Sequence, residues 1–358
     1  MIDGFEIEFL TVGDTGRSGD CILVRYREDG RYKILAYDGG VKSSGEAMVR
    51  HIQEYYQTDT VDFLVNSHPD NDHASGLSVV LEKLKVKELW MHRPWLYCDE
   101  ICHYFKDGRI TNNSLARRFQ EKMSAAYRLE VLATERDIPI KEPFYGEFIG
   151  PFQVLSPERN WYIHELVQEF NKTPEQKNNL NTEDFRGFLH ESIQKIFENW
   201  DKETLKNNVT TSAENESSVI LFANMHNNRV LLTGDAGVRA LTQALDNAEY
   251  LGLNIQNCDF VQMPHHGSRH NVSPEVLDRL LGPRVSKGFT PTKISYVSVG
   301  PKSKTHPRQA VVNAFIRRGY KVYKTTRANG VIKHHRGLSK REGWVSITEV
   351  PFLEKVDA

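Results

Sequence analysis

The chain has 358 residues, 39% of them hydrophobic, a length that can bury a sizeable core as one large domain or two. Its 46 Lys and Arg against 47 Asp and Glu give a net charge of −1, and its four Cys fit reduced thiols in a cytoplasmic protein. No apolar run approaches 18 residues and the first residues lack the basic and apolar regions of a signal peptide, which argues against a spanning helix and a membrane partner.

The amino-terminal part of the chain predicts strands first and helices later. Residues 1–94 have the pattern of strands, interrupted by a helix at 45–57 and by a second helix after Gly76. Residues 96–135 lack the alternation of strands and predict mostly helix. Within them, Asn112-Asn113-Ser114 is the expected helix cap, because short polar side chains accept hydrogen bonds from free backbone N–H groups.

One short segment carries most of the functional signal. It is Ser67-His68-Pro69-Asp70-Asn71-Asp72-His73, and it follows the apolar run Val61 to Val65, which predicts a strand that ends in a loop. One loop cannot direct all these His and Asp side chains at a single small ion without severe strain. Two ions can share them, with His68 and Asp70 facing one ion and Asp72 and His73 the other. The alternative is a polar turn of Pro, Asn and Asp, and the two His count against it.

Three later predicted strands also end in polar groups suited to metal binding or catalysis. The strands with their following motifs are Arg229–Leu232 with Thr233-Gly234-Asp235, Phe260–Met263 with Pro264-His265-His266-Gly267-Ser268, and Ile294–Gly300 with Thr305-His306-Pro307. An isolated Gly-Asp is usually a turn, and an isolated His is usually a surface or core residue. The repeated order of strand and polar motif favours one site at the ends of several strands.

The middle of the chain predicts one strand and then an insertion. Phe152 to Pro157 has the pattern of a strand, and residues 158–214 are polar and charged, with helical stretches at Trp161–Phe170 and Phe185–Trp200. In the second stretch, apolar residues with roughly 3.6-residue spacing predict a stripe that faces the core: Phe185, Phe188, Leu189, Ile193, Ile196 and Trp200. Residues 173–181 and 207–215 are expected to be mobile.

The positive charge is concentrated near the end of the chain. Residues 302–341 contain 12 Lys and Arg and no Asp or Glu, which leaves 34 basic against 47 acidic residues elsewhere, a balance of −13. This asymmetry predicts a basic face toward an anionic partner such as nucleic acid. The side chains expected on it are Lys302, Lys304, Arg308, Arg317, Arg318, Lys321, Lys324 and Arg327. The alternative is an ordinary solvated helix surface.

These motifs, in this order, resemble those of the metallo-β-lactamase-fold hydrolases, and within them the hydrolase domain of the bacterial DNA-uptake protein ComEC. The resemblance runs along most of the chain: Phe9–Asp14, Gly19–Val24, Leu35–Gly40, Ser67–Gly76, Asn215–Leu221, Leu232–Asp235, Pro264–Ser268, Ser298–Gly300, His306-Pro307, and a final hairpin of Val322–Thr325 with Gly330–Ile332. It implies an α+β fold, an αβ/βα four-layer sandwich, as a single domain over residues 1–358 with residues 158–214 as a helical insertion.

The resemblance also implies two divalent ions, Zn or Mn, and a set of site residues. The implied metal ligands are His68, Asp70, Asp72, His73, Asp235 and His265, with Asp235 between the ions and His266 left open as the alternative to His265. Asp70 stands where the wider superfamily has a second His, and this harder oxygen ligand favours Mn. No His between Gly76 and Asp235 matches the superfamily's third motif. The implied catalytic residues are Asp72, Asp235, His266, Ser268 and His306, and the implied substrate-binding residues are Lys302, Lys304 and Arg308.

The sequence therefore predicts a metal-dependent phosphodiesterase, first of all a nuclease that cuts DNA with a hydroxide held by two ions. The alternatives are a small-molecule hydrolase, acting on a cyclic nucleotide, a nucleotide or an ester, and an assembly subunit whose metal site has decayed. A closed pocket roofed by residues 158–214 would favour a small substrate, and a broad salt-sensitive groove would favour DNA. The same insertion is a candidate surface for a protein partner.

Overall fold

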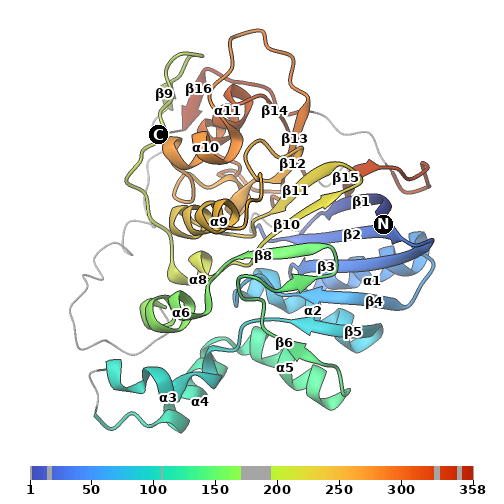
Figure 1. Cartoon of the computed structure of the whole chain (residues 1–358), viewed down its shortest axis with the longest axis vertical. Helices are drawn as coiled ribbons and strands as arrows, with labels where there is room; N and C mark the ends of the chain where they lie inside the picture. The colour runs from blue at the N-terminus through green and yellow to red at the C-terminus, as the bar shows by residue number, and fades with distance from the viewer. Residues whose placement is uncertain are drawn as a thin grey trace.

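The computed structural model describes residues 2–13, 18–105, 108–170, 195–325, 331–344 and 349–357. Two seven-stranded sheets lie face to face, and helices cover the outer faces of the pair (Figure 1). The α+β four-layer sandwich predicted from the sequence is confirmed. Within the described ranges, no helix is long and apolar enough to span a membrane.

The first sheet joins an antiparallel half to a parallel half. Its strands follow the order β15-β1-β2-β3-β4-β5-β6. In that order they span Val331–Arg336, Ile2–Leu10, Cys21–Glu28, Arg31–Gly39, Thr60–Val65, Lys85–Trp90 and Ile140–Lys141. Strands β15 to β3 pair antiparallel and strands β3 to β6 pair in parallel. The loops that follow the parallel strands β3 and β4 therefore leave the sheet at the same edge.

The second sheet has the same mixed character. Its order is β14-β13-β12-β11-β10-β8-β7. In that order the strands span Tyr320–Lys324, Lys293–Val297, Phe260–Gln262, Asn228–Leu232, Ile220–Met225, Phe152–Ser156 and Phe148–Ile149. Strands β11 to β14 are parallel, so the polar motifs predicted after three of them emerge at one edge. A separate pair joins β9 (Lys195–Phe197) to β16 (Lys355–Asp357).

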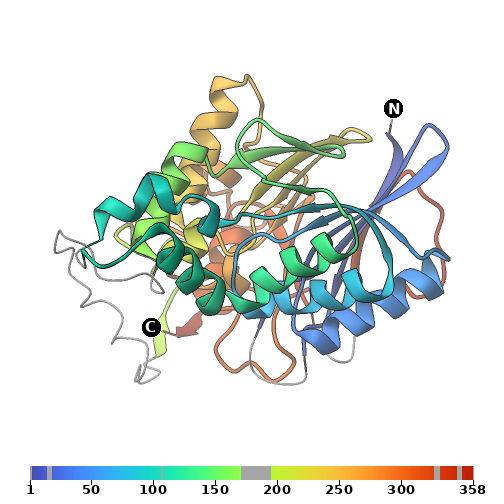
Figure 2. The same ribbon diagram turned by 90° about the horizontal axis from the view of Figure 1, so that it is seen from below.

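Three helices cover each sheet. Helices α1 (Lys42–Tyr55), α2 (Asn71–Lys83) and α5 (Ser124–Glu135) lie side by side on the first sheet (Figure 2). The helices on the second sheet are α9 (Val238–Tyr250), α10 (Pro274–Leu281) and α11 (Gln309–Arg317). The remaining helices are α3 (Cys98–Ile101), α4 (Asn112–Lys122), α6 (Arg159–Trp161), a π-helical turn (Tyr162–Leu166), α7 (Val167–Glu169) and α8 (Ala213–Glu216).

The alternation of β1 places an apolar core between the sheets. Phe5, Ile7 and Phe9 are fully buried in the cluster formed by the two inner sheet faces. Glu6 and Glu8 point to the opposite face, because successive side chains of a strand alternate. They are also buried, and Arg341, near the end of the chain, pairs with both of them.

Glycines let α2 pack directly against the end of β3. A Cβ atom on Gly76 would lie 1.8 Å from the carbonyl oxygen of Gly39, which no side chain permits. The backbone N–H of Gly76 instead donates to the carbonyl of Gly40 at 2.8 Å. This close approach holds the first turn of α2, with Asp72 and His73, beside the end of β3.

Two local predictions are wrong. The N-cap of α4 is Thr111, one residue before the predicted Asn112-Asn113-Ser114: the Thr111 side chain accepts from the backbone N–H of Ser114 at 3.2 Å. Of the predicted cap only Ser114 takes part, because its hydroxyl accepts from the backbone N–H of Thr111 at 2.9 Å. The last strands do not form a hairpin, because β14 pairs with β13 in the second sheet and β15 pairs with β1 in the first. The order of the two strands along the chain does not reveal which sheet each one joins.

The insertion departs from the prediction in its second half. Residues 171–194 lie outside the described residues, and so do the loop expected at 173–181 and most of the stripe that starts at Phe185. Ile196 lies in strand β9, so the predicted helix does not continue to Trp200. The expected mobile loop at 207–215 ends in α8, where the side chain of Asn215 is buried.

A buried ion pair ties the insertion to the second sheet's helices. Arg317 and Glu198 are both fully buried, and the guanidinium lies 3.1 Å from the carboxylate. Asn313 donates to the same carboxylate at 2.8 Å, and Arg317 Nε donates to the carbonyl of Trp200 at 3.0 Å. Removing one member of such a pair leaves the other charge buried and unpaired.

We expect Glu198→Ala to lower the free energy of unfolding by about 3–5 kcal/mol, because it leaves the buried charge of Arg317 without its partner. The matched control is Glu121→Ala, which breaks an exposed pair with Arg117 and should cost less than about 0.5 kcal/mol. Urea unfolding followed by circular dichroism measures both. Equal losses for the two variants would contradict a structural role for the Arg317 pair.

Candidate metal centre

The candidate metal centre lies where loops from both sheets meet. The loop after β4 in the first sheet carries the predicted His and Asp motif. The loops after β11 and β12 in the second sheet carry Asp235 and the pair His265-His266. A backbone hydrogen bond joins the sheets beside the centre: the N–H of Val219 donates to the carbonyl of Ser67 at 3.0 Å.

Four imidazole rings surround one buried carboxylate, that of Asp235. The Nε2 atoms of His73, His265 and His68 lie 3.3, 3.6 and 3.8 Å from its Oδ2. The Nε2 atom of His266 lies 3.6 Å from its Oδ1. The structure thus brings together residues from three loops that are far apart in the chain.

Unpaired polar atoms in this cluster fit a divalent metal. The Nε2 atoms of His68, His73 and His266 and Oδ1 of Asp235 are buried and form no hydrogen bond with any residue that the structure describes. Leaving a buried polar atom unsatisfied costs about 1–3 kcal/mol. A cation bound between them would satisfy these atoms, and imidazole nitrogen and carboxylate oxygen are ligands suited to Zn and Mn. Three overlapping sets of residues each offer ligand atoms that lie within 4.8 Å of one another inside the set: Asp38-His68-His73, Asp72-His73-His266 and Asp20-His73-Asp235.

Hydrogen bonds on the far side of each ring set its orientation. Nδ1 of His73 lies 2.8 Å from Asp38 Oδ2, and Nδ1 of His266 lies 3.0 Å from the carbonyl oxygen of Ser298. Nδ1 of His68 lies 2.9 Å from the hydroxyl of Ser67. When Nδ1 donates to an oxygen, Nε2 is the nitrogen left for a metal. Each ring therefore directs Nε2 toward Asp235.

Asp38 belongs to the candidate metal centre, although the sequence prediction did not include it among the site residues. It is fully buried at the end of β3 and accepts hydrogen bonds from the backbone N–H of Ser67 at 2.7 Å, from its hydroxyl at 2.6 Å, and from His73 at 2.8 Å. Its backbone has φ 57°, a left-handed conformation that is uncommon outside Gly. The Asp-Gly-Gly motif after a strand was a signal for it, but not for its partners.

Asp20 is a second residue that the prediction did not include. It is buried beside the centre, 4.0 Å from Nδ1 of His73, and its Oδ2 accepts from Gln262 Nε2 at 2.8 Å. Gln262 Oε1 in turn accepts from the backbone of Thr233 and Gly234, at 2.9 and 3.1 Å. This chain of bonds fixes the loop that carries Asp235.

Burial and neighbouring charges shift the acidities of the centre in opposite directions. Burial, assisted by Asp235 and Asp38 and opposed by His73, raises the pKa of Asp20 to about 8. Burial also opposes the charge of Asp235, but the surrounding His side chains outweigh it and hold the pKa of that carboxyl well below its usual range. For His73, the carboxylates outweigh burial and raise its pKa well above the usual value, so a metal that binds there must displace a proton.

The predicted metal ligands Asp70 and Asp72 lie at the start of α2. Asp70 is the residue before the helix, with Oδ2 3.8 Å from Nε2 of His68. Asp72 is in the first turn and groups with His73 and His266 rather than with His265. The grouping favours His266 as the partner of Asp72 and His73, while Nε2 of His265 lies 3.6 Å from Oδ2 of Asp235, so both rings remain candidate ligands of the centre. The assignment of ligands to individual ions stays a prediction.

The predicted catalytic residues Ser268 and His306 flank the His265-His266 pair. Ser268 is buried directly after it, and the ring of His306 stacks on that of His265 at 6.4 Å between centroids. Burial, with the charges of His266 and His265, lowers the pKa of His306 to about 3. His306 is therefore neutral at pH 7 and offers a hydrogen bond rather than an ionised acid.

The segment that carries His306 also carries three of the predicted cationic side chains. The backbone N–H of Arg308 donates to the carbonyl of Gly267 at 3.0 Å, which ties this segment to the loop of His265 and His266. Lys302 and Lys304 are exposed on it. These three predicted substrate-binding side chains thus belong to a segment attached to the metal centre.

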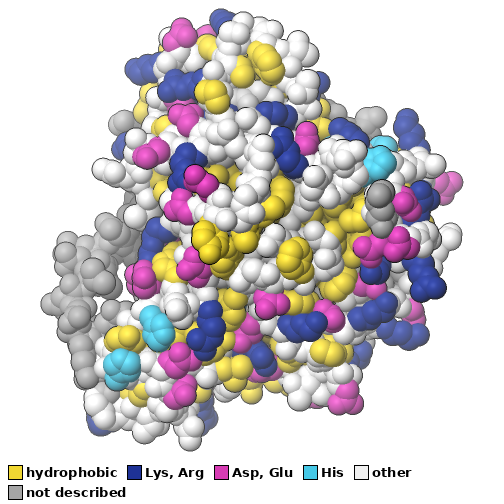
Figure 3. All heavy atoms as spheres, in the orientation of Figure 1, with side chains coloured by type: hydrophobic (Ala, Val, Ile, Leu, Met, Phe, Trp, Pro, Cys, Tyr) yellow, Lys and Arg dark blue, Asp and Glu magenta, His cyan; other side chains and the backbone are white. Residues whose placement is uncertain are grey.

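The wider basic face is not formed as predicted. Arg317 and Arg318 are buried: Arg317 pairs with Glu198, and Arg318 with Glu203 at 3.1 Å and Asp278 at 2.8 Å. Lys321 and Lys324 are half-buried in β14, and Arg327 lies outside the described residues. On the face drawn in Figure 3, Lys and Arg are interspersed with Asp and Glu rather than gathered into one stripe.

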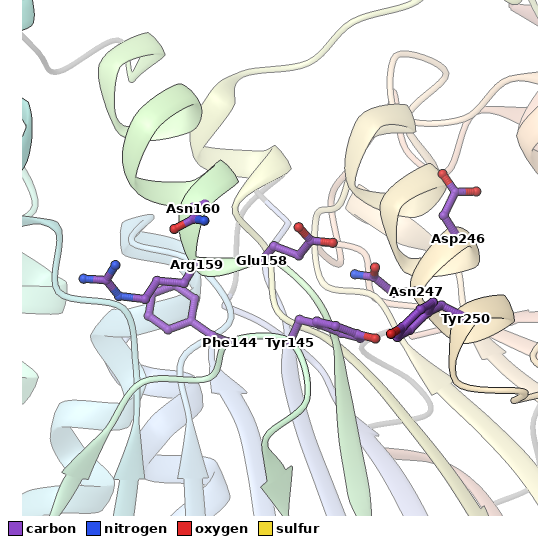
Figure 4. A pocket seen from close by; sticks show the side chains of 8 residues that line it. All are labelled: Phe144, Tyr145, Glu158, Arg159, Asn160, Asp246, Asn247 and Tyr250. Atoms are coloured by element: carbon purple, nitrogen blue, oxygen red, sulfur yellow. The ribbon is translucent and has the colours of Figure 1, made fainter.

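A surface cavity of about 490 Å³ lies apart from the candidate ligands (Figure 4). It is lined by Phe144, Tyr145, Glu158, Arg159, Asn160, Asp246, Asn247 and Tyr250. None of these residues belongs to the cluster around Asp235. The cavity therefore gives no measure of what the metal centre binds.

Comparisons with known proteins give one family match and several distant structural similarities. A family model described as the metallo-beta-lactamase superfamily matches residues 14–100. The chain is similar to Tm1679, described as a metal-dependent hydrolase of the β-lactamase superfamily, at 14% identity and a TM-score of 0.43, with 92% of this chain and 98% of that chain covered. It is also similar to the metallo-β-lactamase fold protein YhfI from Bacillus subtilis, at 7% identity and a TM-score of 0.41, with 93% and 100% covered.

A third similar structure is a metallo-β-lactamase from Hirschia baltica, at 12% identity and a TM-score of 0.33, with 78% of this chain and 92% of that chain covered. Structural likeness at these levels carries no argument about substrate. No curated protein matches the chain in sequence. The match to the metallo-beta-lactamase superfamily model is confined to residues 14–100, the part of the chain that carries His68, Asp70, Asp72 and His73.

Proposed function

We propose that this protein is a metal-dependent hydrolase that cleaves phosphodiesters, with DNA as its first candidate substrate. One observation carries the proposal: four imidazole Nε2 atoms converge on the carboxylate of Asp235 at 3.3–3.8 Å. Divalent metal bound there would supply Lewis-acid polarisation of a phosphoryl oxygen and a nucleophile from water at neutral pH. The near-complete ligand set argues against a subunit with a decayed site, and the one departure is that no His between Gly76 and Asp235 matches the superfamily's third motif.

The residues around the cluster fit the handling of a phosphate group. His68, Asp70 and Asp72 combine imidazole with carboxylate oxygen, a donor set that accommodates Mn as well as Zn. Neutral His306 and the hydroxyl of Ser268 are hydrogen-bond donors that could hold a phosphoryl or leaving-group oxygen. The resemblance to the ComEC hydrolase domain supports DNA as the phosphodiester.

Fewer cationic side chains than the sequence suggested support nucleic acid as the substrate. Lys302 and Lys304 are exposed on the segment with His306, and Arg308 is half-buried there. Contacts of this kind position a phosphate backbone without reading its sequence. The burial of Arg317 and Arg318 favours the second candidate function, hydrolysis of a smaller phosphodiester such as a cyclic nucleotide, because fewer charges remain to follow a long strand.

We expect the purified protein to cut labelled DNA when Mn or Zn is added, and the Asp72→Ala/Asp235→Ala double variant to lose this activity by at least about a thousandfold, since both carboxylates are proposed metal ligands. Gel assays with single- and double-stranded DNA, RNA and cyclic nucleotides measure it. Asp62→Ala is the matched control, because Asp62 is a buried carboxylate on β4 that pairs with Lys87 and caps the N–H of Ile34.

The control separates loss of chemistry from loss of fold. Asp62→Ala should keep metal-dependent cutting while losing some stability. If the protein cleaves cyclic nucleotides but not DNA, the result would support the second candidate function, hydrolysis of a smaller phosphodiester. Full activity in the double variant would contradict the metal-centre proposal altogether.

Metal binding should also stabilise the folded chain, because the ligand cluster exists only there. At a free metal concentration of a thousand times Kd, the gain is about 4.1 kcal/mol. We expect Mn or Zn to raise the melting temperature of the metal-stripped protein, and Asp235→Asn to abolish that rise. Differential scanning calorimetry with and without chelator measures it. An equal rise in Asp235→Asn would show that the metal binds elsewhere.

A further inference from the structure

Asn271 joins two loops of the metal centre. It is fully buried in the turn between the Pro264–Gly267 3-10 turn and α10. Its Nδ2 donates to the backbone carbonyl of Asp235 at 2.8 Å and lies 3.4 Å from that of Ala236. Its Oδ1 lies 2.8 Å from Nδ1 of His265. One side chain thus contacts the loop of Asp235 and the ring of His265 together.

The orientation of the Asn271 amide is fixed by what it contacts. Backbone carbonyls of Asp235 and Ala236 only accept hydrogen bonds, so they must face the NH₂ group of Asn271. Its Oδ1 therefore faces His265, and only a protonated Nδ1 can make that contact. With the proton on Nδ1, the Nε2 lone pair of His265 is directed toward Asp235, 3.6 Å away.

Asn215 contacts the same ring nitrogen but does not constrain it. Its Nδ2 lies 3.1 Å from Nδ1 of His265 and 2.8 Å from the hydroxyl of Thr211. A hydroxyl both donates and accepts, so the Asn215 amide can turn by half a rotation and present its oxygen to both partners. Asn271 has no such freedom, because its partners on the other side are carbonyls. The contact with Asn271 therefore determines which ring nitrogen of His265 carries the proton.

The same side chain restrains a strained turn. His265 and His266 have φ 43° and 56°, and Gly234 in the facing loop has φ 52°. Non-glycine residues in this region cost about 1–3 kcal/mol each and persist when surrounding contacts hold them. The N–H of His265 donates to the carbonyl of Gly234 at 3.1 Å, and Asn271 adds the second link between the two loops.

We infer that Asn271 is the positioning residue that makes His265 a metal ligand: it selects the tautomer with a free Nε2 and ties that ring to the loop of Asp235. The inference rests on the proposed metal centre and adds to it a residue outside the predicted ligand set. It assigns to Asn271 no contact with substrate.

The tautomer is measured in the metal-free protein by nitrogen-15 NMR of the His side chains, with His265→Gln used to assign the signal. The wild-type ring of His265 should carry its proton on Nδ1. In Asn271→Ala this preference should be lost, while Asn271→Asp, which keeps an acceptor for Nδ1, should retain it. A wild-type ring protonated on Nε2 alone, or an unchanged tautomer in Asn271→Ala, overturns the inference.

Metal affinity is measured in parallel by calorimetric titration of the metal-stripped variants with Mn and Zn. Asn271→Ala should bind about 10–100-fold more weakly, the usual effect of losing a partner of a metal-binding His. The matched control is Asn247→Ala, which removes a buried Asn whose Nδ2 donates to the carbonyl of Leu155 at 2.9 Å, away from the centre. It should bind metal as the wild type does.

The outcomes separate this inference from the proposed function. If the wild type binds no metal, the proposed metal centre fails. If the wild type binds metal and Asn271→Ala, folded by circular dichroism, binds it equally well, only the role of Asn271 fails. If Asn271→Ala does not fold, Asn271→Asp provides the test. This variant keeps an acceptor for Nδ1 of His265 but loses the donor to the carbonyl of Asp235, so it should keep the Nδ1 proton and bind metal more weakly than the wild type. An unchanged metal affinity would overturn the proposed tie between the two loops.

Discussion

The carboxylate of Asp235, buried among four imidazole rings, is the constraint on which the site depends. A charge in such a position is unfavourable unless partners compensate it. Here His68, His73, His265 and His266 place their Nε2 atoms within 3.8 Å of its oxygens, and a bound divalent cation would compensate the charge. Several buried polar atoms of the cluster form no hydrogen bond with any described residue, an arrangement suited to a cation rather than to a packed core.

The two sheets of the sandwich together hold the residues of this cluster in place. The first sheet supplies Asp38 and the loop of His68 and His73, and the second supplies Asp235 and the His265-His266 turn, so neither sheet has a complete site alone. Close packing at Gly76 sets the height of α2 against β3. Left-handed backbone at Asp38, His265 and His266 shows that local conformational preference is overridden where the ligands meet.

The sequence predicted that His68, His73, Asp235 and the His265-His266 pair lie together, because each of these motifs follows an apolar strand in a recognisable order, and the structure brings them around one carboxylate. It predicted less about what supports them. Asp38, Asp20 and Asn271 act through partners that are distant in the chain, and no local pattern reveals such contacts. Arg317 illustrates the same limit: its spacing suited an exposed basic face, yet it is buried against Glu198, 119 residues earlier. Strand pairing was equally hidden, since β14 and β15 follow one another but join different sheets.

The most direct test of the account is a crystal structure of the protein grown with Mn, read from the anomalous difference map at the metal's absorption edge. The account predicts two peaks about 3.5–4 Å apart beside the Asp235 carboxylate, the spacing of dinuclear hydrolytic centres. Each peak should lie within bonding distance of at least one of the four Nε2 atoms. A map with metal only at other positions, and none beside Asp235, would contradict the central claim.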